Sequence, residues 1–346
     1  MDLSFTPEQH AVRDLARQIF DGMCTEDRLR EIEAGGERHD PALWTELARA
    51  GLLGLSIPEA DGGSGGGIIE LCLLLEEAGR AAAPVPLWGA LVTGSLPVAR
   101  FGSGEQRAQL LAPYPLGGAP VVAALDEANR IAIDDGGATG TLTLVPAAAM
   151  AAAIIVAAAD GVFVIDPAGA VLERQNEPIG SPLYRVTLEG ARAEQLAGLD
   201  VVPWVREHAL VGLCALQTGI CDRAVRLTAE YLSGREQFDK PLGSFQAVQQ
   251  RIADAYINLE TVRWTMWRAA FLLAQGRPAA EETAVAKHFA SAAGARALEA
   301  AQHLHGGMGV DTDYPLHRYR LLAHQVELTL GGSWPHLAAL GEMIAR

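Results

Sequence analysis

The chain has 346 residues, enough for two or three domains with a substantial buried core. Its composition, 49% hydrophobic and 20% charged, excludes a disordered chain. The 27 Lys and Arg against 42 Asp and Glu give a formal net charge of −15, which argues against nucleic-acid binding but not against an anionic ligand in a local basic pocket. The four cysteines form no C-x-x-C pair, so we expect reduced, buried thiols: Cys24, Cys72, Cys214 and Cys221.

The start of the chain shows no signal-peptide pattern. Met1, Asp2 and Leu3 are followed by polar residues rather than by a basic segment and an apolar core. The most apolar stretch, residues 145–156, is shorter than the ~20 residues that a membrane-spanning helix needs. We therefore expect a soluble, cytoplasmic protein without a membrane span.

Residues 1–117 are predicted to form an N-terminal α-helical domain. Thr6, Pro7 and Gln9 have the signature of a helix start, with Thr6 as N-cap, Pro7 at the first helical position and Gln9 closing a capping box. Apolar residues then recur with the 3.6-residue period over residues 12–20. Further along, the pattern predicts a helix, a glycine-rich loop and another helix, over residues 41–50, 51–67 and 68–82.

Residues 118–200 are predicted to form a small middle β-domain. Short β-favouring runs lie at regular spacing, with turn residues between them, which is typical of an antiparallel arrangement. The runs are residues 131–133, 141–145, 161–165 and 184–188.

Residues 201–346 return to helical periodicity. Long amphipathic segments with short connections favour an antiparallel helical bundle. The segments are residues 205–233, 244–275, 281–304 and 315–330. The sequence thus predicts a mainly α protein with a small β-domain between two helical parts.

Three stretches carry the most specific signals in the sequence. They are W-T-E-L-A-R-A-G-L-L-G-L-S-I-P-E-A-D-G-G-S-G at residues 44–65, R-E-Q-F-D-K-P-L-G-S-F-Q at 235–246, and H-L-H-G-G-M-G at 303–309. In this order and at these separations they resemble the acyl-CoA dehydrogenase family. Within it, the chain is most similar to the short, degenerate subunits found in bacterial sterol side-chain oxidation.

The resemblance implies a fold and a chemistry. The fold is an N-terminal helical domain, a β-barrel-like middle domain and a C-terminal four-helix bundle. The chemistry is FAD-dependent dehydrogenation of an acyl-CoA, with an electron-transferring flavoprotein as acceptor. The family's oligomers, homo- or heteromeric tetramers built from dimers, share each FAD between two subunits: one holds the flavin ring, and its neighbour's bundle holds the pyrophosphate and adenosine.

The resemblance also assigns FAD contacts to Arg235, Gln237, Phe238 and Gln246. A guanidinium offers paired donors to phosphate oxygens and stays charged. An amide can hydrogen-bond the dinucleotide, and a phenyl ring gives a flat apolar surface against it. The alternative for Arg235 and its neighbour Glu236 is a solvated helix end.

His303, Gly306, Gly307 and Gly309 are a second set of FAD-contacting candidates. Glycines let the backbone approach a ligand closely and supply the positive φ of a tight turn. A helix C-cap followed by a turn is the alternative, and Gly306 alone would satisfy it. The family usually has Gln in place of His303, so the replacement makes this contribution pH-sensitive. No metal site is predicted from His303 and His305, because no carboxylate or cysteine cluster accompanies them.

The carboxylate base of the family is missing from its expected places. Removing the α-proton of a thioester needs such a base within hydrogen-bond reach. Leu330 stands at the usual position and Ala209 at the position that other members use, and neither can take a proton. Glu207 and Glu327 lie nearby, but Glu207 is about 200° around a helix from Ala209. Both are otherwise surface carboxylates, and the catalytic residue stays unassigned.

The half of the site that holds the flavin ring also departs from the family. The family's Thr-Glu-Pro-x-x-Gly-Ser segment is replaced by Leu-Asp-Glu-Ala-Asn-Arg at residues 125–130. The family's Trp-Ile-Thr strand is absent, and an Ala-rich run at residues 147–153 occupies roughly that region.

These departures lead to three hypotheses. The first is the partner subunit of a heteromeric acyl-CoA dehydrogenase, which lends its FAD contacts to a flavin whose ring and base belong to another chain. The second is a self-sufficient homo-oligomer with a relocated base. The third is a non-catalytic scaffold that keeps the fold and has lost FAD. The sequence leaves open whether the acyl group is a fatty acid or a steroid side chain.

Overall fold

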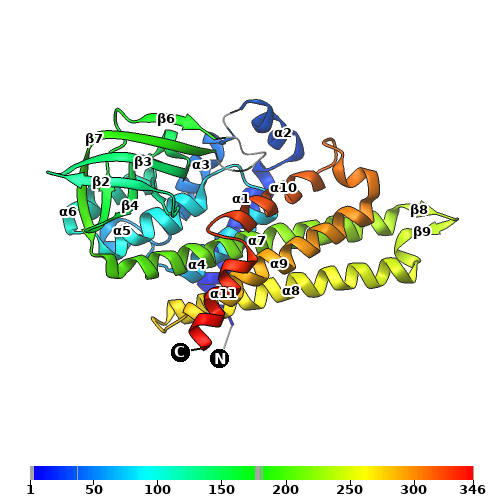
Figure 1. The fold of residues 1–346 in the computed structure, drawn as a ribbon. Coiled ribbons are helices and arrows are strands. Elements are labelled where there is room, and N and C mark those ends of the chain that lie inside the picture. Colours follow the sequence, from blue (N-terminus) through cyan, green and yellow to red (C-terminus); the bar gives the residue numbers. More distant parts are fainter. Residues whose placement is uncertain (1–3, 37, 176–179, 181, 346) are drawn as a thin grey trace.

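The structure is a computed structural model that describes residues 4–36, 38–175, 180 and 182–345. Met1, Asp2 and Leu3, on which the expectation about a signal peptide rests, lie outside the described residues. Helices come first, a β-sheet follows, and a long helical bundle ends the chain (Figure 1). The predicted helix–strand–helix order is confirmed. Within the described ranges, no helix is both long and apolar enough to cross a membrane.

The N-terminal helices begin where the sequence predicts. Thr6 caps α1 (Pro7–Met23): its Oγ1 accepts a hydrogen bond from the Gln9 amide at 3.3 Å, and Gln9 Oε1 accepts one from the Thr6 amide at 3.0 Å. The predicted helices at 41–50 and 68–82 are α3 (Pro41–Arg49) and α4 (Ile68–Arg80). Further helices, outside the predicted set, are α2 (Glu26–Ala34), the π-helix η3 (Trp88–Ser95), α5 (Leu96–Phe101) and α6 (Gly104–Leu111).

The middle of the chain forms a seven-stranded sheet. Its strands are β1 (Val121–Ala124), β2 (Arg130–Asp134), β3 (Gly137–Pro146), β4 (Ala153–Ala158), β5 (Gly161–Ile165), β6 (Val171–Arg174) and β7 (Leu183–Ala197). The order is β1-β4-β5-β7-β3-β2, with β6 also paired to β7. The expected antiparallel arrangement holds for five of the six strand pairs, and it is wrong for β1 and β4, which pair in parallel. The chain leaves β1 for the β2–β3 hairpin at the other end of the sheet and re-enters beside β1 in the same direction.

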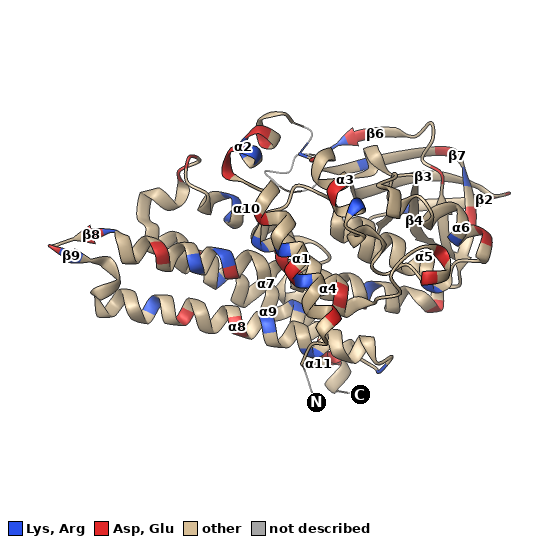
Figure 2. Cartoon of the chain, turned by 180° about the vertical axis from the view of Figure 1, so that it is seen from behind, with Lys and Arg blue, Asp and Glu red and all other residues tan. Residues whose placement is uncertain are grey.

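The C-terminal helices form an elongated bundle. The four predicted segments are α7 (Val202–Gly234), α8 (Gln246–Ala274), α9 (Ala280–His305) and α10 (Leu316–Leu328), and α11 (Ser333–Ile344) follows. A small hairpin, β8 (Glu236–Gln237) with β9 (Lys240–Pro241), projects at the far tip of the bundle (Figure 1). Acidic and basic residues are interspersed along the bundle helices (Figure 2).

Helices α4 and α7 cross with their backbones in contact, which joins the N-terminal helices to the bundle. A Cβ added to Gly219 of α7 would lie 1.8 Å from the Glu76 carbonyl oxygen, and one added to Gly79 of α4 would lie 2.2 Å from the Leu216 carbonyl oxygen. Glycine is therefore required on both helices at this crossing.

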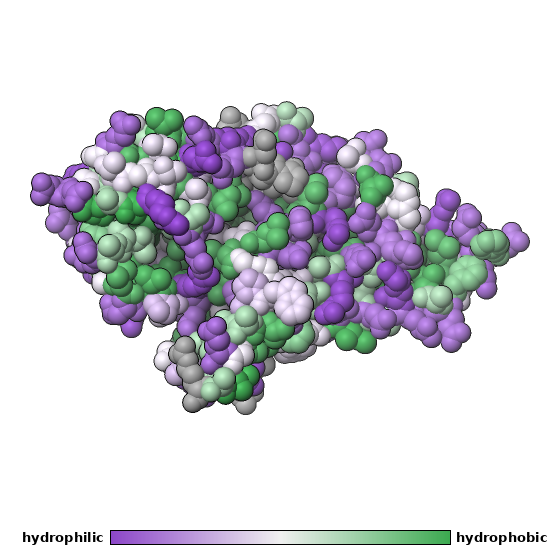
Figure 3. Space-filling model, in the orientation of Figure 1, coloured by the Kyte–Doolittle hydropathy of each residue, from purple (hydrophilic) through white to green (hydrophobic). Residues whose placement is uncertain are grey.

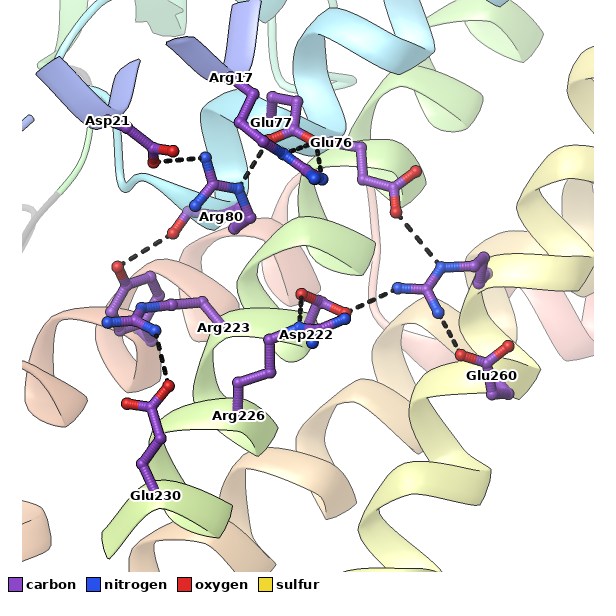
Figure 4. Close-up of polar contacts among 12 residues, drawn as sticks. Arg17, Asp21, Glu76, Glu77, Arg80, Asp222, Arg223, Arg226, Glu230 and Glu260 are labelled. Carbon is purple, nitrogen blue, oxygen red and sulfur yellow. Dashed lines mark hydrogen bonds and ion pairs between the residues drawn. The ribbon is translucent and has the colours of Figure 1, made fainter. Parts of the chain in front are cut away.

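A network of ion pairs surrounds the same crossing (Figure 4). Arg263 of α8 contacts Glu76 of α4 at 3.3 Å and Asp222 of α7 at 3.0 Å. Arg80 of α4 contacts Asp21 of α1 at 2.7 Å. Because these side chains come from four helices, the network fixes the N-terminal helices against the bundle, next to the cavity described below.

Candidate functional site

A cavity of about 540 Å³ lies where α4, the start of η3, β1, α7 and the end of α10 meet. This volume falls within the range of ~300–1,000 Å³ that small-molecule sites occupy. Ala78 and Gly79 of α4 and Leu213 and Ile220 of α7 form part of its wall, so the backbone crossing of these helices positions one side of the cavity.

The cavity wall is mainly apolar, and most of its polar side chains already have partners. Trp88 Nε1 donates to the Ala209 carbonyl at 2.8 Å, and Thr329 Oγ1 donates to the Gln325 carbonyl at 2.7 Å. Arg206 pairs with Glu127 at 3.0 Å. Thus three of the four side-chain hydrogen-bond donors among the described lining residues are engaged, which leaves a chamber suited to apolar groups.

Two carboxylates reach the cavity from the loop after β1, and the sequence analysis did not recognise them as lining residues. Asp126 Oδ1 accepts hydrogen bonds from the Ala128 amide at 2.7 Å and from Thr143 Oγ1 at 3.1 Å. Glu127 is largely exposed and pairs with Arg206. The sequence feature that could have identified Asp126 and Glu127 is their position in the segment, residues 125–130, that replaces the family's Thr-Glu-Pro motif. Their hydrogen bonds and ion pair give them a structural role in the cavity wall.

The two positions expected for a base bear side chains that cannot accept a proton. Leu330 lines the cavity, with φ of +58°. Ala209 is buried, and its carbonyl is bonded by Trp88. The alternatives Glu207 and Glu327 are not among the lining residues: Glu207 is half-buried, which raises the pKa of its carboxyl, and Glu327 contacts His324 at 3.3 Å.

The Ala-rich run expected near the flavin ring does not reach the cavity. Residues 147–153 form a short turn and the start of β4. Leu144, on β3, lines the cavity instead, where a bulge between Leu142 and Val145 gives it a φ of +53° and leaves it half-exposed. An aliphatic side chain therefore faces the cavity from this strand.

The predicted FAD contacts gather elsewhere, at the tip of the bundle. The end of α7, the start of α8 and the end of α9 lie there together (Figure 1). The exposed members of this set are Arg235, Gln237, Phe238, Gln246, His303, Gly306 and Gly307; Gly309 is buried. These eight residues are called the tip set below.

The hairpin in the tip set is shaped to present side chains to solvent. Phe238 and Asp239 both have positive φ, +54° and +61°, and Phe238 is 85% exposed. Lys240 Nζ lies 4.2 Å from the centre of the Phe245 ring. No ion pair of the Arg235 guanidinium is found among the described residues, so this cation is available to an anionic ligand.

The two histidines near the end of α9 have different surroundings. His303 is exposed, whereas His305 is buried against the Tyr231 ring, 4.4 Å between centroids, with Nε2 3.0 Å from Tyr314 Oη. Burial lowers the pKa of His305. Gly306 has φ of +60° and its amide donates to the His303 carbonyl, so the predicted C-cap is present. In the described part of the chain, no group of three potential metal ligands was found.

The tip set and the cavity are far apart along the same helix. Ile220 is the lining residue of α7 nearest to the tip, and Arg235 follows it by 15 positions. At about 1.5 Å per residue, the separation is roughly 22 Å. The chain therefore offers two separate half-sites, an apolar cavity and an exposed polar tip.

Comparisons with known proteins cover both helical parts. The model of the acyl-CoA dehydrogenase N-terminal domain matches residues 6–116, and that of the C-terminal domain matches residues 197–333. The acyl-CoA dehydrogenase FadE27 of Mycobacterium tuberculosis is 35% identical over 370 residues, which cover 100% of this chain and 99% of that protein. FadE28 of the same organism is 32% identical, with 99% and 98% covered.

Solved structures show the same relationship. A chain in the ChsE4-ChsE5 complex from Mycobacterium tuberculosis is 34% identical with a TM-score of 0.94, and 100% of this chain and 99% of that chain are covered. A chain in a variant of the Tcur3481-Tcur3483 steroid ACAD is 40% identical with a TM-score of 0.92, and 98% of each chain is covered. Butyryl-CoA dehydrogenase from Megasphaera elsdenii, at 22% identity and a TM-score of 0.90, shares the fold.

Proposed function

The chain belongs to the acyl-CoA dehydrogenase family of FAD-dependent oxidoreductases, and we propose that it acts as the partner subunit of a heteromeric acyl-CoA dehydrogenase. The observation that carries this proposal is the contrast between its half-sites. The tip set holds the residues that the family resemblance assigns to FAD, seven of the eight exposed, whereas the cavity of the same chain has Leu330 where the resemblance places the base.

The tip set fits the pyrophosphate and adenosine half of FAD. Arg235 presents a free guanidinium, and Gln237 and Phe238 stand beside it on an exposed hairpin. Charge-assisted bonds from arginine to phosphate are strong and directional. Since these groups project away from their own chain's cavity, they serve a cofactor held by a neighbouring subunit.

The cavity fits the flavin ring poorly. A flavin needs hydrogen-bond donors for its polar edge, and three of the four side-chain donors in the described wall, Trp88, Thr329 and Arg206, already donate to groups of their own chain. When bound, FAD supplies the acceptor for the hydride that leaves Cβ of the acyl thioester. In the proposed complex the ring and the base belong to the other chain, and this chain binds and orients the distal half of the dinucleotide.

The surface of the bundle supports association with another chain. Tyr256, Ile257 and Trp264 are exposed on α8, and Trp334 and Ile344 on α11 are 79% and 71% exposed. Hydrophobic and near-neutral residues gather where α11 lies in Figure 3. Apolar surface of this kind marks protein interfaces. Two similar solved chains come from complexes that are named as pairs of proteins.

We extend the proposal to the substrate and the electron acceptor. The similarity to a steroid ACAD chain supports a steroid acyl-CoA as the substrate of the assembled enzyme. An electron-transferring flavoprotein is the acceptor that the family resemblance implies. Both assignments concern the complex rather than this chain alone.

The flavin content of the purified chain tests the proposal. We expect little FAD absorbance per chain when the protein is produced alone, and close to one FAD per pair of chains after co-expression with a dehydrogenase subunit that has its own base. One full equivalent of FAD on the chain alone would overturn the partner-subunit role. An assembled pair without FAD would instead favour the scaffold hypothesis.

A further inference from the structure

The last residues of α10 and the turn that follows, residues 326–333 together, form the part of the cavity wall that carries Leu330. Lys287 of α9 holds its beginning. The Lys287 side chain is 0% exposed, and its Nζ donates to the carbonyls of Val326 and Glu327, both at 2.9 Å, and lies 3.2 Å from Ser291 Oγ. The three donors of this ammonium group are therefore all directed at neutral oxygen atoms.

A buried ammonium without a bonded carboxylate is unusual. The Glu327 carboxylate contacts His324 instead, at 3.3 Å. The two carbonyls that accept hydrogen bonds from Lys287 lie in the last turn of α10, where the helix dipole places partial negative charge. Lys287 thus caps the C-terminal end of α10 from a neighbouring helix and fixes where the chain leaves it.

His336 of α11 holds the other side of the same turn. Its Nε2 lies 3.0 Å from the Leu330 carbonyl oxygen, and its side chain is buried. Because a carbonyl oxygen only accepts, Nε2 is the donor in this contact, and burial lowers the pKa of His336. His288, next to Lys287, adds a contact of 2.9 Å between its Nδ1 and Ser333 Oγ.

The backbone between these contacts is strained. Leu330 has φ of +58° and Gly331 has φ of +94°. A left-handed conformation is unfavourable for a residue with a Cβ and persists only where the surroundings impose it. Side chains from α9 and α11 supply that constraint, and the result is that the Leu330 side chain faces the cavity.

We propose that Lys287 and His336 are positioning residues that hold the turn so that the side chain at position 330 enters the cavity. Neither residue is assigned to the FAD half-site, and neither lines the cavity. The inference concerns the shape of this chain's own cavity, so it stands or falls independently of the partner-subunit role.

A cysteine at position 330 can report where that side chain points. The native thiols give a low background, because burial raises the pKa of Cys24, Cys214 and Cys221 to about 12 and that of Cys72 well above its usual range. In Leu330→Cys we would measure labelling by apolar N-phenylmaleimide and by an anionic sulfonatoethyl methanethiosulfonate. A thiol inside the apolar cavity reacts preferentially with the apolar reagent.

We expect that adding Lys287→Met or His336→Leu to Leu330→Cys lowers the ratio of apolar to anionic labelling by about tenfold or more. The loss of one charge-assisted or buried hydrogen bond is large enough to cause a change of this size. His336→Gln keeps an N–H donor near the Nε2 position and is expected to restore the ratio. Leu144→Cys, at another lining position away from the turn, is the control and keeps its ratio in both backgrounds.

An unchanged ratio at position 330 in both variants would overturn the proposal. So would an equal fall at positions 144 and 330, because that pattern means a general collapse of the cavity. Thermal unfolding of each variant, followed by circular dichroism, checks that labelling is read on the folded protein; should Lys287→Met fail to fold, His336→Leu and His336→Gln decide the question.

Discussion

Arg235→Ala in the co-expressed complex tests the FAD half-site directly. A hydrogen bond to a charged group contributes about 1.5–3 kcal/mol. At about 1.4 kcal/mol per tenfold, its loss weakens FAD binding by roughly 10- to 150-fold. The fold itself should be unaffected, because the Arg235 side chain is exposed and the hydrogen bond from residue 235 to the Tyr231 carbonyl, 2.9 Å here, is donated by the backbone amide.

The dissociation constant is measured by titrating FAD into the cofactor-free complex and following the quenching of flavin fluorescence. Arg277→Ala is the matched control, since Arg277 is an exposed arginine beyond the other end of α8. Raising the salt concentration should weaken FAD binding less in Arg235→Ala than in the wild type, because one cation–phosphate contact is missing. Equal FAD affinity in Arg235→Ala and the wild type would refute the placement of the pyrophosphate at the tip.

Three further predictions concern the fold and the cavity. Burial lowers the pKa of Lys287 from 10.5 to about 8, with Cys214 and Glu327 opposing the shift. Between these two pH values the unfolded chain therefore binds more protons than the folded chain. The free energy of unfolding of the wild type, relative to that of Lys287→Met, should rise from pH 8 to 10.5 when both are unfolded in urea. A difference that does not change with pH would contradict the burial of Lys287. Gly219→Ala should destabilise the protein by about 3 kcal/mol or more, because its Cβ would meet the Glu76 carbonyl, whereas Gly234→Ala on the same helix, with open space around it, should be harmless. Leu330→Glu places a carboxyl group in an apolar wall, and burial there raises the pKa of that carboxyl. The variant should therefore lose stability relative to the wild type as pH rises from 4 to 7. A stability difference that does not change with pH would mean that the side chain points to solvent.

Local patterns predicted most of the fold, and their failures have physical reasons. Helix α2 escaped notice because only Leu29 of its nine residues is buried, so no apolar period marks it. The π-helix η3 is buried on nearly every side, and a helix that is apolar all round shows no period either. The parallel pairing of β1 with β4 joins strands that are separated by a hairpin, and periodicity carries no information on such non-local partners.

The two half-sites differed in how far the sequence could predict them. The tip set lies on two short continuous stretches around a helix end and a hairpin, so a motif could locate it. The cavity wall joins Trp88, Arg206 and Leu330 from elements far apart in the chain. Motif spacing predicted Leu330 as the position of the missing base, but Lys287 and His336, which contact the turn around it, belong to no motif and were visible only in the structure.

The separation of the half-sites explains how such a chain can lose a base and still serve an enzyme. Sites more than about 7–10 Å apart respond to substitutions almost independently. With roughly 22 Å of α7 between cavity and tip, replacing a carboxylate at position 330 leaves the contacts of Arg235 and Phe238 untouched. In a homo-oligomer the same replacement would remove the base from every site. In the proposed complex with a second chain, it removes only the base of this chain's own cavity, and the tip remains available to the cofactor at the partner's active site. The position of the loss, at the cavity and not at the tip, is therefore the pattern expected for a subunit that acts through its neighbour.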